Sequence, residues 1–168
     1  MGYVHDTSMS QFIPVTAMHI VGGVWAASAG AVAGAIGWKH TAGADVPVIN
    51  IPIVLPSNSV ALKGAYLKSI EIDYAITAFV ANTITATMIK ITRKVDGTAV
   101  GHAHPAVTQD LAAGAAAVSV DDHTLTVTVT TPPWIDNDDA YLLVLTCDLA
   151  VGTEFMLLGA VANFTLRA

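Results

Sequence analysis

Apolar and polar residues alternate with a period of two along much of this chain. Between residues 66 and 78 and again between 123 and 131, apolar side chains occupy one face and polar side chains the other. This alternation is typical of half-buried β-strands. The two segments and their neighbours along the chain therefore predict a core that contains Ile70, Ile72, Tyr74, Ile76, Leu125, Val127, Val129, Leu143, Leu145, Phe155 and Leu157.

Turn signals at short spacing separate further strand-like segments. Asp96-Gly97 is a tight-turn signal, and Pro132-Pro133 ends the preceding strand pattern. Residues 101–117, which include a small-residue run at 112–117, show no regular pattern and are compatible with a loop or a single helical turn. The remaining strands are expected at Val21–Ser28, Gly34–Thr41, Val46–Leu55, Thr83–Thr92, Tyr141–Leu149 and Glu154–Leu166.

The strand pattern predicts an all-β fold. We expect an antiparallel β-sandwich, jelly-roll-like, with about eight strands. Residues 1–17 are expected to form a short extended N-terminal arm, and residues 18–168 a single domain. An arm of this kind packs on a neighbour or frays.

The segment from Ala17 to Trp38 lacks Lys, Arg, Asp and Glu and has the length of a membrane-spanning helix. Its glycines and alanines supply little transfer free energy, and its flanks lack basic asymmetry. We therefore favour two short strands separated by a small-residue turn at residues 29–33. No secretory signal is expected at the N-terminus, because the first basic side chain is Lys39.

Composition narrows the classes of function. Charged residues make up 12% of the 168 residues and hydrophobic residues 54%, which excludes a disordered chain. Seven basic against thirteen acidic residues give a net charge of −6, which argues against a nucleic-acid surface. The single cysteine, Cys147, excludes a disulfide framework and lies on the predicted inward face of its strand.

The last two predicted strands carry apolar residues on both faces. Such strands need a second cover besides the opposing sheet, either the chain's own arm or another subunit. We favour a homo-oligomer, with the contact made by Leu142, Met156, Leu158 and Phe164 and with Trp134 near its edge.

Candidate chemical sites are sparse. His102 and His104 have a spacing that can bind a metal if a third ligand joins them, but solvent-exposed histidines are the simpler interpretation. Asp136–Asp139 is oxygen-rich yet reads best as an acidic turn. Trp25, Trp38 and Trp134 would suit a sugar-binding surface, a core or an interface. We expect no enzyme activity, no catalytic residue, no metal and no cofactor.

The order of elements resembles a group of small bacteriophage and metagenomic structural proteins. The resemblance covers residues 22–167 and rests on "VPVINIPIVLP", "LKGAYLKSIEIDYAIT" and "HTLTVTVTTPPWIDNDDAYLLVLTCDLAVGTEFMLLGAVANFTL". These proteins look like jelly-roll capsid decoration (cement) or fibre-type virion proteins. The resemblance implies a homotrimer on the capsid surface that binds the major capsid protein, and it carries over no functional residue.

Three functions follow as hypotheses. The first is a non-enzymatic virion protein that binds and stabilises the capsid lattice, located on the virion or otherwise extracellular. The second is a carbohydrate- or receptor-binding virion module. The third is a subunit of an extracellular filament, assembled by exchange of a strand or of the arm. None of them involves nucleic acid or a membrane.

Overall fold

The computed structural model describes residues 6–29, 36–40, 43–57, 64–93, 101–111 and 118–167. Within them the chain forms twelve strands and one short 3-10 turn at Val15–Ala17. The strands are β1 (Asp6–Pro14), β2 (His19–Val21), β3 (Trp25–Ala29), β4 (Ile36–His40), β5 (Val48–Ile53), β6 (Gly64–Ala78), β7 (Thr83–Thr92), β8 (Gly101–Ala103), β9 (Val107–Gln109), β10 (Asp122–Val129), β11 (Asp139–Asp148) and β12 (Glu154–Arg167).

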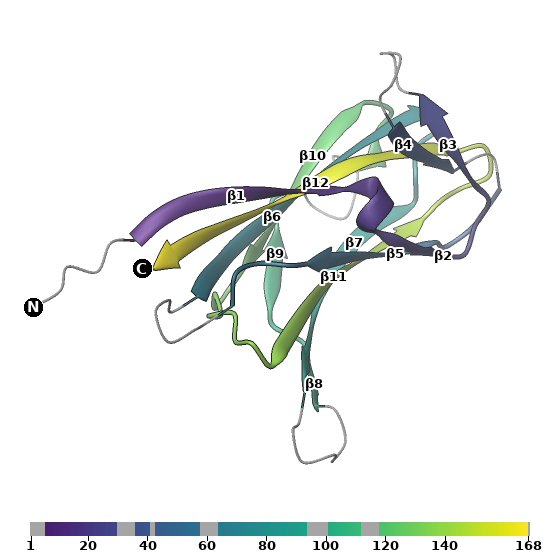
Figure 1. The fold of residues 1–168 in the computed structure, drawn as a ribbon. Helices are drawn as coiled ribbons and strands as arrows, with labels where there is room; N and C mark the ends of the chain where they lie inside the picture. The colour runs from purple at the N-terminus through teal and green to yellow at the C-terminus, as the bar shows by residue number, and fades with distance from the viewer. Residues whose placement is uncertain are drawn as a thin grey trace, which may run out of the picture.

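The strands form two antiparallel sheets that pack face to face as a sandwich (Figure 1). One sheet has seven strands in the order β3-β4-β12-β6-β10-β9, with β1 also paired to β12. The other has five strands in the order β2-β5-β11-β7-β8. From β5 to β7, and again from β10 to β12, consecutive strands switch sheets. The four-strand sets β4-β12-β6-β10 and β5-β11-β7-β8 give the strand order of a jelly roll.

The core lies where the period-two pattern predicted it. All eleven predicted core residues are at most 2% exposed. The thiol of Cys147 is also buried on the inner face of β11, and this burial raises its pKa. The jelly-roll β-sandwich expected from the sequence is confirmed.

Three details differ from the sequence-based expectation. Four short or peripheral strands, β1, β2, β3 and β9, join the jelly-roll set, so the described residues form twelve strands instead of about eight. Residues Asp6–Pro14 of the expected arm form β1, because their backbone pairs with β12 from Arg167 to Gly159. The irregular region 101–117 contains β8 and β9.

The uncharged segment 17–38 forms strands where it is described, namely β2, β3 and the start of β4. Within the described residues, no helix has the length and apolar character needed to cross a bilayer. The expected turns at 29–33 and 95–98 and the small-residue run 112–117 lie largely outside the described residues.

Pairing of β1 with β12 brings the first and last described strands side by side (Figure 1). Asp6 lies opposite Arg167, and Tyr66 near the start of β6 lies opposite Thr165. Residues from three distant parts of the chain therefore meet at one end of the seven-stranded sheet.

Candidate functional site

Trp134 forms one wall of a cleft of about 410 Å³ at this end of the seven-stranded sheet. Pro132-Pro133 ends the β10 segment, and the chain then runs beside β6, where the N–H of Leu67 donates to the carbonyl of Pro133 at 3.1 Å. The indole lies 4.8 Å from the Tyr66 ring, centre to centre, and remains 38% exposed. The cleft is lined by Asp6, Tyr66, Lys68, Trp134, Thr165 and Arg167.

Arg167 contacts both the acidic and the aromatic side chain of this cleft. Its guanidinium donates twice to the Asp6 carboxylate, at 2.7 Å and 2.9 Å, while its central carbon lies 5.0 Å from the centre of the Trp134 ring. The hydrogen bond from Arg167 lowers the pKa of the Asp6 carboxyl, and the same bond raises the pKa of Arg167. The cleft therefore presents an indole flanked by a bidentate ion pair.

The hydroxyl of Thr165 is the second unusual feature of this cleft. Thr165 is only 7% exposed, and its Oγ1 has no hydrogen-bond partner among the described residues. A buried hydroxyl without a partner is costly, about 1–3 kcal/mol. A polar ligand or an ordered water in the cleft would remove that cost.

A polar row continues from this cleft across the outer face of the seven-stranded sheet. Asn163 on β12 is its centre: Ser10 of β1 donates to Asn163 Oδ1 at 2.6 Å, and Asn163 Nδ2 donates to Glu71 of β6 at 2.8 Å. On the next strand, Thr124 donates to Asp73 at 2.7 Å. Side chains on four adjacent strands are thus ordered by hydrogen bonds across the sheet.

The row ends at a second hollow, of about 450 Å³, which is lined in part by Phe12, Leu158, Asp73 and His123. Phe12 is 59% exposed, and its ring lies against Gly159, where an added Cβ would be 2.7 Å from the ring. The polar row therefore has an aromatic side chain at each end and hydrogen-bonding groups between them.

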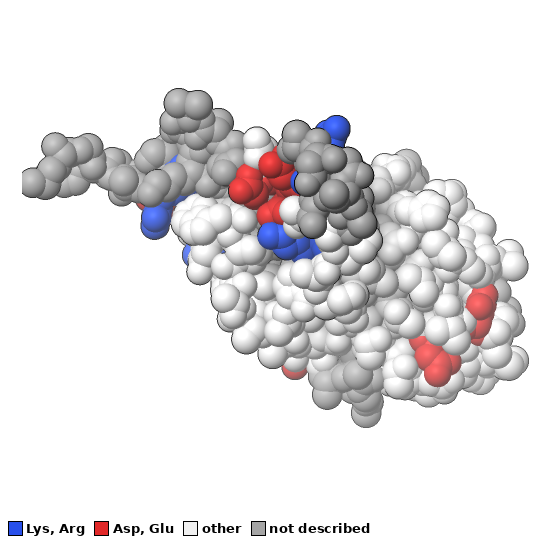
Figure 2. All heavy atoms as spheres, turned by 90° about the horizontal axis from the view of Figure 1, so that it is seen from below, with Lys and Arg blue, Asp and Glu red and all other residues white. Residues whose placement is uncertain are grey.

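The outer face of the five-stranded sheet has a different character. Three cross-strand rows cover β5, β11 and β7, and none of their nine residues is charged: Pro52, Leu142 and Ile89; Asn50, Val144 and Thr87; Val48, Thr146 and Thr85. Figure 2 shows a side of the molecule on which charged side chains form a few small groups between broad uncharged areas.

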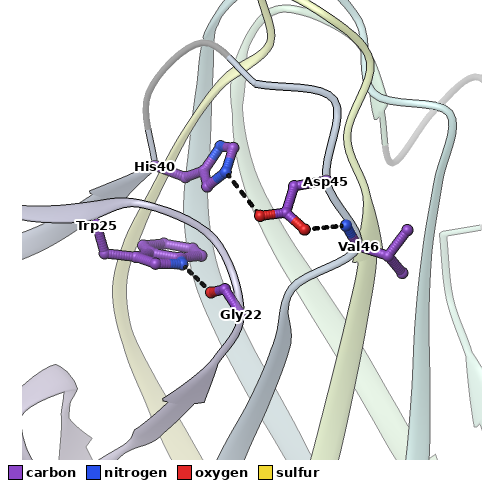
Figure 3. Close-up of polar contacts among 5 residues, drawn as sticks. All are labelled: Gly22, Trp25, His40, Asp45 and Val46. Carbon is purple, nitrogen blue, oxygen red and sulfur yellow. Dashed lines mark hydrogen bonds and ion pairs between the residues drawn. The ribbon is translucent and has the colours of Figure 1, made fainter.

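Trp25 and Trp38, the other two tryptophans singled out from the sequence, are half-buried on β3 and β4, away from Trp134. They line a separate groove with Met18, Ile20, Gly22 and Gly23. The Trp25 Nε1 donates to the carbonyl of Gly22 at 2.9 Å (Figure 3). The structure thus divides the three tryptophans between two sites.

Behind this groove lies the pair formed by His40 and Asp45 (Figure 3). His40 is 1% exposed, and its Nε2 is 3.8 Å from an Asp45 oxygen, too far for the hydrogen bond that would orient a catalytic base. Gly23 closes the space with φ +78°, and an added Cβ would lie 2.8 Å from the His40 ring. We interpret this cluster as packing of the sheet edge.

The five residues predicted for a subunit contact differ in exposure. Leu142 and Met156 are half-buried on outer faces, while Leu158 is 37% exposed and Trp134 lines its cleft. Phe164 is 3% exposed and packs in the chain's own core, so its expected place in a subunit contact is wrong.

A β-bulge explains the error at Phe164. Leu157 pairs with Tyr74 and Gly159 with Asp73, so Leu158 is an extra residue in β12. Before the bulge, Phe155 and Leu157 face the core, and after it the even-numbered residues do. A strict period of two carried through Leu158 therefore assigns Phe164 to the wrong face.

The other candidate groups stay apart. His102 and His104 are exposed, and Asp139 pairs with Lys90 at 2.7 Å and accepts from Thr92 at 2.7 Å within the five-stranded sheet. No cluster of three or more His, Cys, Asp or Glu side chains suited to a metal forms in the part of the chain that the structure describes. That the protein uses no metal or cofactor stays a prediction.

Comparison with known proteins gives little beyond architecture. No family model matches the sequence, and no curated protein matches it. Among solved structures, the chain is similar to a carbohydrate-binding module of the beta-sandwich superfamily with promiscuous specificity, at 9% identity and a TM-score of 0.41. That match covers 95% of this chain and 56% of the other, so this chain spans just over half of its length.

Two further modules show similar likeness. The family 32 module of Clostridium perfringens NanJ in complex with galactose has 14% identity and a TM-score of 0.36, with 92% of this chain and 99% of that chain covered. The family 11 module from Clostridium thermocellum in complex with a mixed-linked tetrasaccharide has 10% identity and a TM-score of 0.30, with 97% and 87% covered. At TM-scores below 0.5 these likenesses carry no argument about the ligand of this chain.

Sequence reasoning identified Trp134 but missed the rest of its cleft. Asp6 and Arg167 stand 161 positions apart, and only the register of β1 against β12 brings them together. Tyr66 and Thr165 meet through the register of β6 against β12. The sequence itself offers one signal, the presence of an isolated aspartate near one end of the chain and an isolated arginine near the other.

Proposed function

We propose that this protein is a non-catalytic glycan-binding module whose ligand stacks on Trp134. The observation that carries the proposal is the cleft itself, a partly exposed indole beside Tyr66 and surrounded by charged and hydroxyl groups. Pockets that combine an aromatic surface with a few fixed polar groups are the usual form of small-ligand sites.

The chemistry of a pyranose ring fits this arrangement. Its C–H face is apolar and packs on an aromatic ring, while its hydroxyl groups both donate and accept hydrogen bonds. Asp6 supplies acceptors, Arg167 and Lys68 supply donors, and the Thr165 hydroxyl has no other described partner. The bond between Asp6 and Arg167 fixes both groups before a ligand binds, which reduces the entropy lost on binding.

A glycan array followed by calorimetry tests the proposal. The wild type should bind at least one glycan class, and Trp134→Ala should weaken that binding by about 30-fold or more, as loss of a central tryptophan contact does. Trp134→Phe keeps an aromatic face and should retain part of the affinity. Thermal melts confirm that both variants fold. Wild-type protein that binds no glycan, or equal binding by Trp134→Ala, would refute the proposal.

A second candidate is a structural subunit, such as a capsid decoration protein, that binds a repeating protein lattice as a homotrimer. The observation that favours it is the set of three uncharged rows on the outer face of the five-stranded sheet, where Leu142 lies between Pro52 and Ile89, and Val144 between Asn50 and Thr87. An uncovered apolar sheet face of this kind is typical of a protein contact. Light scattering of the wild type and of Val144→Lys tests it, because a contact on this face predicts an oligomer that the lysine dissociates.

A further inference from the structure

We infer that the ligand is a linear, uncharged glycan chain that crosses the outer face of the seven-stranded sheet from Trp134 to Phe12. This inference rests on the proposed function and extends it from one cleft to a track. The two hollows, one at the end of the sheet and the other beside the middle of β12, have similar volumes, about 410 Å³ and 450 Å³, and each contains a partly exposed aromatic ring.

Strand register sets the length of the track. Tyr66, which packs on Trp134, lies opposite Thr165 on β12, and Phe12 lies opposite Val161 on the same strand. Four residues of strand correspond to about 13 Å. With Trp134 beyond Tyr66, the two aromatic platforms are separated by more than one sugar ring, so a single monosaccharide cannot contact both.

The space between the platforms is lined with hydrogen-bonding groups. Asn163 stands midway between Thr165 and Val161 on β12, held by Ser10 on one side and Glu71 on the other. Ser10 is exposed, and Asn163 and Glu71 are partly exposed, so a ligand on this face can reach all three side chains. A chain of hydroxyl-bearing rings would replace water at these groups with ordered partners.

Charge along the track selects the class of glycan. Glu71 and Asp73 bond to Asn163 and Thr124, which are neutral, and no ion pair recorded for the described residues includes either carboxylate. At the Trp134 end, Arg167 is already neutralised by Asp6, and Lys68 is the remaining cation of the cleft, so positive charge is confined to that end. Uronic acid or sulfate groups would therefore meet uncompensated negative charge in the middle of the track. Neutral hexose chains carry no such penalty.

The test is calorimetry with neutral linear hexose oligosaccharides of increasing length, from the disaccharide to the hexasaccharide, and with oligogalacturonates of the same lengths. We expect the affinity for the neutral series to rise until the chain reaches Phe12. Phe12→Ala should then lower affinity for the longest chain by about tenfold and leave the disaccharide unchanged. Phe79→Ala, which removes an exposed phenylalanine from the turn after β6, is the matched control and should have no effect.

The outcomes separate the two proposals. Binding that depends on Trp134 but not on chain length or Phe12 would overturn the track and leave the glycan-binding function standing. Stronger binding of oligogalacturonates than of the neutral series would overturn the charge selection, and so would Glu71→Gln if it failed to improve oligogalacturonate binding. No binding of any oligosaccharide would overturn both the function and the track.

Discussion

The outer face of the seven-stranded sheet and that of the five-stranded sheet are built on the same pleated geometry but present different side chains. On the first, Ser10, Asn163 and Glu71 form hydrogen bonds across three strands. On the second, the row through Val144 pairs it with Asn50 and Thr87, and the neighbouring rows are equally uncharged. The first face therefore holds ordered hydrogen-bonding groups, which our proposal assigns to a hydroxyl-rich ligand, whereas these rows of the second face hold uncharged side chains.

The largest loss of stability is expected at Phe164, whose side chain points from β12 into the core. Phe164→Ala removes a ring that is 3% exposed and should lower the free energy of unfolding by about 3–5 kcal/mol. Leu158→Ala, at the bulge, removes a side chain that is 37% exposed and should cost well under half of that. Urea denaturation measures both. Equal costs would mean that the bulge does not reverse the facing of β12.

A smaller effect separates the two outer faces directly. Asn163→Ala removes the centre of the hydrogen-bonded row and should cost about 1 kcal/mol. Asn50→Ala is the matched control, because Asn50 is also half-buried on an outer face, between His19 and Val144. It should change stability by no more than about 0.5 kcal/mol. Chemical denaturation of the two variants gives the comparison, and a reversed order would contradict it.

The smallest effect concerns pH. The bond from Arg167 lowers the pKa of Asp6 below its ordinary value of 3.8, so the pair stabilises the fold above that value and is lost as pH falls through the lower, folded-state pKa. Both side chains are exposed, so the change in melting temperature should be small. Asp6→Asn should melt below the wild type at neutral pH and together with it in strong acid. A difference that persists in strong acid would assign the effect to another cause.

The five-stranded sheet offers the opposite pH behaviour as a contrast. The hydrogen bond to Asp139 raises the pKa of Lys90, so this pair stabilises the fold at neutral pH and is lost as pH rises through the raised pKa. Melting of Lys90→Met should therefore differ from the wild type at neutral pH and converge with it in strong base. A difference that persists unchanged in strong base would contradict the assignment.

Alternation alone located the interior of this fold. The inward residues of β10, of β11 and of β6 from Ile70 to Ile76 follow an unbroken period of two, and those residues are buried as expected. In β12 the period is interrupted at Leu158, and no local signal marks the bulge, so Phe164 was assigned to the wrong face. Trp134 is a candidate from sequence because tryptophan side chains suit sugar-binding surfaces as well as cores and interfaces. Its partners were not, because strand register between distant segments is a tertiary property.

The pairing of β1 with β12 also has a kinetic consequence. Asp6 and Arg167 are 161 positions apart, and β6 joins the same strand from the middle of the chain. Contacts between such distant segments close only after a large loss of chain entropy, which places this fold among the slow-folding topologies of high contact order. Until β12 is in place, β1 has no strand partner among the described residues, so the Trp134 cleft cannot form before the two ends of the chain meet.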